Sequence, residues 1–324
     1  MKLDMLKTDD GCYLYRTETS KNNPESGRYK SNRVVLHRPK KKSEWKTLVY
    51  IGDKIRTSHA KAHDQGYVYV NVASILSIDD SNKKLAKTAR KFRKVLSVIY
   101  YGAPSDVAGM GINTCRHASR VCRLFCLNTA GNGSITGVQL SRIARTRLSR
   151  WATAAFWAMF EDDLNRFLRK AKREKKRLAC RPNGTTDEHS AELIRLIRKY
   201  QDVDWYDYTA VPDALDLADE LENYSLTFSR KETHGNLLHV KSARKRGFNI
   251  AAVCDPDVKD IALRKHPEVF VDFDSHDLRL PSIDGSNRVG LLTPKGIMRR
   301  ELQPTTKKTM TYKGYAQLIA DFLQ

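Results

Sequence analysis

The sequence predicts an α/β fold in which a (β/α) barrel-like parallel sheet follows a small β-rich N-terminal extension. Three observations predict it: short strand-like runs near the N-terminus, long helical stretches in the middle, and apolar runs separated by helical segments beyond Leu178. Near-continuous apolar runs are typical of parallel strands buried on both faces. We therefore expect a basic, β-rich accessory region over 1–80 and a barrel-like domain over 81–324.

The N-terminal region alternates β-like runs with turns. A basic stretch containing Lys40, Lys41 and Lys42 lies between two of these runs. It is either a loop that holds nucleic-acid phosphates or simply a solvated loop. The expected strands are 11–15, 33–36, 47–51 and 67–72.

Two stretches have helical periodicity. A basic helix is expected from Ser81 to about Tyr100, and the strongest helical signal runs from Val138 to about Arg177, as two helices or one bent helix. Cations crowd the first turns of this second stretch, where the helix dipole disfavours them. We expect a bound anion, such as nucleic-acid phosphate, to neutralise them. The cations are Arg142, Arg145, Arg147 and Arg150.

Beyond Leu178 the pattern predicts strands at 178–181, 203–208, 224–229, 248–254 and 288–292. Polar clusters follow or end four of these strands, at 183–187, 207–209, 229–232 and 255–257. In parallel α/β folds the carboxyl ends of the strands form the active site, so we expect these clusters to meet at one mouth. The alternative is that each cluster only caps the following helix.

Charge and composition limit the class of protein. The net charge of +21 and the pI of 9.7 favour a nucleic-acid partner, although a lysine-rich surface can also serve solubility alone. With 40% hydrophobic and 29% charged residues the chain fits neither a disordered nor a membrane protein. We find no apolar run long enough to span a bilayer, expect no membrane partner, and expect a cytoplasmic protein.

Three of the six cysteines lie in the loop 113–133. Cys115, Cys122 and Cys126 are separated by six and then three residues. Thiolates brought together on one loop bind zinc or an iron–sulfur cluster. The neighbouring Arg116, Arg120 and Arg123 are expected to lower the thiol pKa values. The other three cysteines are expected to pack in the core.

Two metal sites are compatible with this loop. Zinc needs a fourth ligand, for which His117 is the nearest candidate and His234 or His239 are more distant ones. A [4Fe-4S] cluster held by three cysteines leaves one iron open, as in radical enzymes that use S-adenosylmethionine. The remaining alternative is three unrelated buried thiols.

Several segments carry a resemblance. The cysteine stretch, Asn-Gly-Thr-Thr-Asp at 183–187, Tyr-Asp-Tyr-Thr at 206–209 and Leu-Thr-Phe-Ser at 226–229 together look like phage-encoded proteins of little-known activity, over roughly 105–300. Residues 202–212 also resemble the nucleophile strand VDxFDCVxPTR of tRNA-guanine transglycosylases and of their phage relatives, the DNA-guanine transglycosylases. The resemblance implies a TIM barrel, a Cys₃His zinc site and exchange of guanine in DNA for a 7-deazaguanine, which evades restriction.

Carried onto this chain, the resemblance assigns roles to single residues. Asp207 would attack the anomeric carbon and Asp187 would shuttle protons to and from the bases. The alternative for Asp207 is a cap of a helix that starts near Pro212. The residues expected to bind the flipped base are Arg181, Asn183, Ser229 and Glu232.

Three functions remain open. The first is base exchange on nucleic acid, DNA in preference to RNA, with a free modified base as the second substrate. The second is a radical S-adenosylmethionine-type enzyme that modifies a base or nucleoside. The third is a non-catalytic nucleic-acid-binding protein stabilised by zinc.

Overall fold

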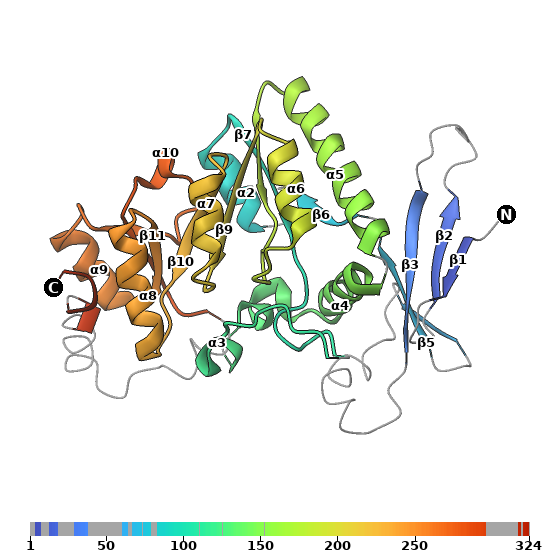
Figure 1. The fold of residues 1–324 in the computed structure, drawn as a ribbon, viewed down its shortest axis with the longest axis horizontal. Coiled ribbons are helices and arrows are strands. Elements are labelled where there is room, and N and C mark those ends of the chain that lie inside the picture. The colour runs from blue at the N-terminus through green and yellow to red at the C-terminus, as the bar shows by residue number, and fades with distance from the viewer. Residues whose placement is uncertain are drawn as a thin grey trace.

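Two β-sheets organise the computed structural model of this protein: a five-stranded antiparallel sheet and an eight-stranded, largely parallel sheet (Figure 1). The structure describes residues 4–7, 13–18, 29–37, 60–63, 67–72, 74–78, 83–295 without 110, 125 and 152, and 317–323 without 319.

The five-stranded sheet lies beside α4 (Thr136–Trp151). Its strand order is β1-β2-β3-β5-β4. Three of the four expected strands are present, whereas the expected strand at 47–51 and the basic residues Lys40, Lys41 and Lys42 lie outside the described residues. The strands are β1 (Asp4–Lys7), β2 (Tyr13–Glu18), β3 (Tyr29–His37), β4 (Ala60–His63) and β5 (Tyr67–Val72).

The eight-stranded sheet has the order β12-β13-β11-β10-β9-β8-β7-β6. Every pairing is parallel except that of β6 with β7. All five strands expected beyond Leu178 are present, and the predicted α/β class with a largely parallel sheet is confirmed. The strands are β6 (Leu76–Ile78), β7 (Val95–Tyr100), β8 (Arg177–Arg181), β9 (Val203–Thr209), β10 (Tyr224–Ser229), β11 (Asn249–Val253), β12 (Phe270–Asp272) and β13 (Val289–Leu292).

Helices follow most of the parallel strands, and α5 to α8 lie in front of the sheet in Figure 1 while α2 lies behind it. The helical stretch predicted from Val138 to about Arg177, as two helices or one bent helix, is confirmed as the two helices α4 and α5. Among the described helices, none has both the length and the apolar character needed to cross a membrane. The remaining helices are α2 (Lys83–Lys91), α3 (Arg120–Leu124), α5 (Thr153–Arg173), α6 (Ala191–Lys199), α7 (Ala214–Glu220), α8 (His234–Lys245), α9 (Pro256–Lys265) and α10 (Pro281–Asp284).

The predicted helix from Ser81 to Tyr100 is wrong in its second half. The helix α2 ends at Lys91, and Val95–Tyr100 forms the buried strand β7 between β6 and β8. The β-branched residues Val95, Val98 and Ile99 favour this strand.

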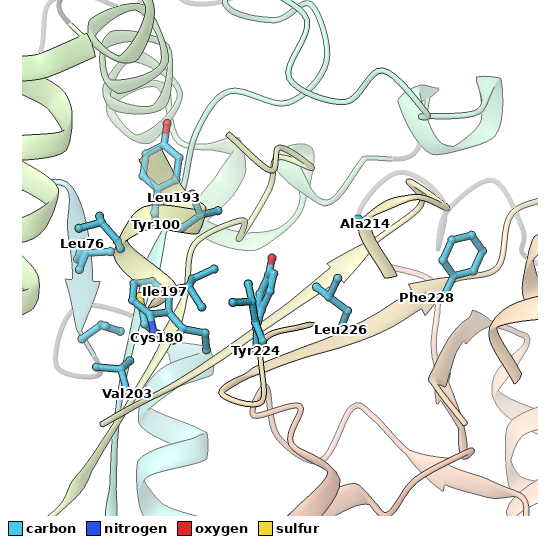
Figure 2. Packing of buried hydrophobic residues seen from close by; sticks show 14 of the residues in the cluster. Leu76, Tyr100, Cys180, Leu193, Ile197, Val203, Ala214, Tyr224, Leu226 and Phe228 are labelled. Carbon is cyan, nitrogen blue, oxygen red and sulfur yellow. The ribbon is translucent and has the colours of Figure 1, made fainter. Parts of the chain in front are cut away.

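Alternating residues of the strands face two cores. Cys180, Val203 and Leu226 pack with residues of α6 such as Leu193 in the larger cluster (Figure 2). Strand residues next to members of this cluster, such as Ala179 beside Cys180 and Tyr206 beside Trp205, point to the other face, because successive strand residues alternate in direction. There Ala179 and Tyr206 pack against Leu278 and Leu280, so the segment before α10 covers the second face.

Candidate functional site

The chain that leaves β8 folds back over the end of β7. The amide of Gly184 donates to the carbonyl of Tyr100 at 2.8 Å, and the Thr185 hydroxyl donates to the carbonyl of Gly102 at 2.6 Å. A Cβ atom at Gly184 would lie only 2.7 Å from the Tyr100 oxygen, so this close approach requires glycine. The fold-back places the predicted polar cluster 183–187 over the end of β9.

Asp207 is the buried centre of this cluster. Its side chain is 0% exposed, and its two carboxylate oxygens accept hydrogen bonds from the amide nitrogen and Nδ2 of Asn183 at 3.1 and 2.9 Å. The Nε atom of Arg181 lies 3.6 Å from Oδ1. Burial raises the pKa of Asp207 to about 7, although Arg181 acts in the opposite direction. This carboxyl group therefore changes protonation close to neutral pH.

Asp187 and Asp207 belong to one network. Oδ1 of Asp187 lies 3.3 Å from Nε2 of His189, whose Nδ1 lies 3.2 Å from the Tyr224 hydroxyl. That hydroxyl donates to Oδ2 of Asp207 at 3.5 Å. The predicted pair of carboxylates is thus brought together, and the alternative of a helix cap is wrong for Asp207, because Asp213 occupies the N-cap of α7.

His189 and Tyr224 join the two carboxylates but are not predicted from the sequence. A histidine two residues beyond Asp187 is a usable signal, because His is the commonest partner of an acid in proton transfer. Tyr224 is indistinguishable in the sequence from a core residue, since it begins a buried apolar strand.

Arg181 is held between two carboxylates. Its Nη1 atom lies 3.1 and 3.0 Å from the carboxylate oxygens of Asp277, and its guanidinium stacks 4.6 Å from the centre of the Tyr208 ring. The neighbouring negative charges, Asp277 first, raise the pKa of Arg181 against the effect of burial. Its charge therefore compensates Asp277 and Asp207 inside the protein.

The cysteine loop 113–133 lies across the same edge of the sheet. The amide of Asp187 donates to the carbonyl of Thr114 at 2.9 Å, and Sγ of Cys115 lies 3.8 Å from the carbonyl of Thr185. Glu232, predicted to bind substrate, accepts hydrogen bonds from Ser119 Oγ and the Val121 amide at 2.6 and 3.1 Å. The tips of β8 and β10 therefore hold the loop, and α3 lies below the strands in Figure 1.

The three thiols of this loop are half-buried. After burial, which is the main cause, the charge of Cys126 adds to the raised pKa of Cys115, and that of Cys122 adds to the raised pKa of Cys126. The Nζ atom of Lys231 donates to Sγ of Cys122 at 3.4 Å. In the described part of the chain, no three or more His, Cys, Asp or Glu side chains are arranged to hold a metal ion.

The expected lowering of the thiol pKa values by arginine is wrong for two of the cysteines. Burial raises the pKa of Cys115 to about 11 and also raises that of Cys126. The three arginines expected to oppose this effect are exposed, so water screens their charge. They are Arg116, Arg120 and Arg123, and the proposed ligand His117 is exposed as well.

Comparison with known proteins shows that residues 76–308 match the family model of Gene product 88. The chain belongs to the Gene product 88 family. No curated protein and no solved structure matches it. The match suggests a phage protein, in agreement with the first resemblance, and nothing in it points to transglycosylases. It begins at β6 and includes the whole carboxyl edge described above.

In this Gene product 88 protein the arginines of α4 bind protein groups. Arg142 is buried against Asn128 and over the Tyr101 ring, and Arg147 is buried and donates to the carbonyl of Ala108 at 2.8 Å. Carbonyl and amide oxygens thus take the place of the expected anion. That these arginines contact nucleic acid stays a prediction. The other two donate outside the helix, Arg145 to the Ser74 carbonyl and Arg150 to Glu188.

Two further predicted positions have local roles. The carbonyl of Ser229 accepts a hydrogen bond from Nδ2 of Asn236 at 3.2 Å, so it orders the start of α8. The cluster 255–257 acts as a helix cap, because Oδ1 of Asp255 accepts from the Asp257 amide at 2.8 Å at the start of α9.

Proposed function

We propose that this Gene product 88 protein is an enzyme that modifies a nucleic-acid base or nucleoside at the carboxyl edge of the eight-stranded sheet. The observation that carries the proposal is the cysteine loop, which hydrogen-bonds to the residues following β8 and β10 across that edge. Active sites of parallel α/β proteins lie at this edge. The net charge of +21 supports a polyanionic substrate.

Cys115, Cys122 and Cys126 would hold a metal centre there. The donor type fits, since three cysteines of one loop suit a thiophilic centre, but their side chains do not surround one point in the described structure and would have to converge on the metal. The cations of Lys231 and Arg142 next to Cys122 and Cys126 would compensate thiolate charge. A [4Fe-4S] cluster held by these three cysteines would supply one-electron chemistry and could bind S-adenosylmethionine. We favour it over zinc because zinc would need a fourth ligand, and the proposed ligand His117 is exposed.

The network next to the loop would handle protons. Asp187 is its member nearest the loop, because its charge acts on Cys115 and its amide binds Thr114. A proton taken up at Asp187 can pass through His189 and the Tyr224 hydroxyl to Asp207, whose pKa of about 7 suits storage of a proton near neutrality.

Base exchange through Asp207 is the second candidate function. It is supported by the network that joins Asp187 and Asp207, since the reaction needs both carboxylates at one site. It is less well supported than cluster chemistry, because a nucleophile must touch the sugar carbon and Asp207 is 0% exposed. In either function we retain DNA as the preferred substrate over RNA.

Metal analysis of anaerobically purified protein tests the proposal. We expect iron and sulfide in the wild type and in Cys254→Ser, a control outside the loop, and their loss in the triple variant Cys115→Ser, Cys122→Ser, Cys126→Ser. Stoichiometric zinc that depends on the same three cysteines would overturn the iron–sulfur assignment. Metal content equal in all three proteins would overturn the site itself.

Nucleoside analysis then separates the two reactions. Nucleic acid is incubated with the loaded enzyme, S-adenosylmethionine and a reductant, and the digested nucleosides are examined by mass spectrometry. A modified nucleoside that requires S-adenosylmethionine supports the first candidate. Exchange of guanine without S-adenosylmethionine would instead support the second candidate. In that case Asp207→Asn should abolish both the exchange and the covalent adduct.

A further inference from the structure

A basic pocket lies on α5, away from the cysteine loop. Its volume is about 360 Å³, and four of its six lining residues are cations. We propose that this pocket binds the phosphodiester backbone of a nucleic acid, and that the protein therefore acts on a polynucleotide and not on a free nucleoside. The lining residues are Ile78, Arg166, Phe167, Arg169, Lys170 and Arg173.

The cations share one face of α5. Their positions are separated by three, four and seven residues, the spacing that aligns side chains along a helix. From Arg166 to Arg173 the helix rises about 10 Å, the axial length of about three nucleotides in one strand of a DNA duplex. A row of cations at this spacing fits an extended polyanion better than a single phosphate group.

Arg166 is fixed in place before any ligand binds. Its guanidinium lies 4.3 Å from the centre of the Phe167 ring, and its Nη2 atom lies 2.6 Å from Oδ1 of Asp163. The other carboxylate oxygen of Asp163 binds the segment before β6. The side chain of Arg166 is still 49% exposed, so an ordered cation faces solvent in this pocket.

Arg169 and Arg173 complete the row. Within the described residues, no carboxylate lies within ion-pair distance of either guanidinium. Arg173 interacts with Glu174 electrostatically at longer range, but neither guanidinium is closely paired with a carboxylate of that part of the protein. An arginine of this kind binds phosphate through its planar, multiply donating guanidinium.

The position of the pocket indicates the length of the substrate. The start of α5 lies near the candidate site, because the preceding Arg150 pairs with Glu188. The end of α5, at Arg173, lies just before β8 begins and so at the opposite edge of the sheet. From Thr153 to Arg166 the helix rises about 20 Å, the axial length of about six nucleotides in one strand of a DNA duplex. A mononucleotide cannot occupy both places. The inference that one strand reaches both the pocket and the candidate site rests on the proposed function, whereas binding to the pocket does not.

Oligonucleotide binding tests the pocket directly. A fluorescently labelled, mixed-sequence single strand of about 20 nucleotides, long enough by the rise above, is titrated with protein at several salt concentrations. For Arg169→Glu/Arg173→Glu we expect weaker binding and a slope of log K against log salt reduced by about two, one for each lost phosphate contact. If the Glu variant does not fold, Arg169→Gln/Arg173→Gln replaces it, and we expect that variant also to bind the oligonucleotide more weakly and with a smaller salt slope.

The control changes charge equally elsewhere. Lys172→Glu/Lys241→Glu reverses two exposed lysines outside the pocket, and we expect it to keep most of the affinity and the wild-type slope. Equal losses in both variants, or wild-type affinity in the pocket variants, would overturn the proposal. The proposal would also be overturned if inorganic pyrophosphate, at equal ionic strength, displaced the labelled strand as effectively as unlabelled oligonucleotide does. Metal content should stay at the wild-type level in every variant, so the two proposals can fail separately.

Discussion

Asn183 donates two hydrogen bonds to Asp207, one from its amide nitrogen at 3.1 Å and one from Nδ2 at 2.9 Å. Its own Oδ1 accepts from the Thr186 hydroxyl at 2.7 Å and from the Glu188 amide at 3.1 Å. The loop 183–188 is thus built around one carboxylate. The protonation state of Asp207 is therefore coupled to the shape of the candidate site.

The pKa of Asp207 predicts how stability depends on pH. It is raised from 3.8 to about 7 in the folded protein, so its contribution to stability is fully present below about pH 4 and is lost as pH rises through 7. We expect Asp207→Asn to flatten the fall of the melting temperature between these pH values. Thermal melts across pH check this, with the exposed Asp257→Asn as control. An unchanged pH dependence in Asp207→Asn would contradict the assignment.

Asp163 is predicted to hold β6 onto α5. One oxygen, Oδ2, accepts from Ser74 Oγ at 2.7 Å and from the amides of Ile75 and Leu76 at 2.7 and 3.0 Å. Hydrogen bonds to a charged group contribute about 1.5–3 kcal/mol each, so we expect Asp163→Ala to lower the free energy of unfolding by about 3 kcal/mol or more. Denaturant titration measures it. The exposed neighbour Asp162→Ala should change it by less than about 0.5 kcal/mol, and equal effects of the two substitutions would refute the role.

Two glycines should respond oppositely to alanine. A Cβ atom at Gly184 would lie 2.7 Å from the Tyr100 oxygen and 2.8 Å from the Tyr101 ring, so we expect destabilisation by about 1–3 kcal/mol. Gly235 lies in α8 with nothing near its Cβ position, and alanine there should stabilise by about 0.5–1 kcal/mol. Unfolding free energies of both variants are compared. A neutral Gly184→Ala would show that the fold-back of the loop is more tolerant than its geometry indicates.

Glu232 is predicted to restrain the cysteine loop. Because its carboxylate accepts from Ser119 Oγ and the Val121 amide, Glu232→Gln should speed hydrogen exchange at Val121 several-fold. The effect is modest because Glu232 is exposed and screened by water. Exchange in Glu222→Gln, an exposed control on the preceding turn, should match the wild type. Identical protection in both variants would remove Glu232 from this role.

The sequence predicts the parallel strands well because their apolar runs are bounded by polar clusters, as in β9 and β10. It fails at Val95–Tyr100, where the apolar positions also fit a helix and only pairing with β8 decides the outcome. It predicts Asp187 and Asp207 from the strand-end clusters and the resemblance, and the structure places both in one network, while their catalytic roles stay predictions. Tyr224 could not be found, because its role depends on contacts with residues 17 and 35 positions away.

The arginines illustrate a second limit. A basic run indicates charge but not whether the side chains reach solvent. Arg142 and Arg147 are buried among loop carbonyls, whereas Arg169 and Arg173 line an open pocket. Only the tertiary packing of α4 and α5 separates these two environments.

The contact between Ser119 and Glu232 joins residues 113 positions apart. At usual rates of translation, about 5–20 residues per second, the cysteines leave the ribosome on the order of ten seconds before the segment that fastens them. During that interval the thiols are accessible to whatever delivers metal in the cell. A centre inserted then would be enclosed when β10 docks, so loading and synthesis of this chain are expected to be coupled in time.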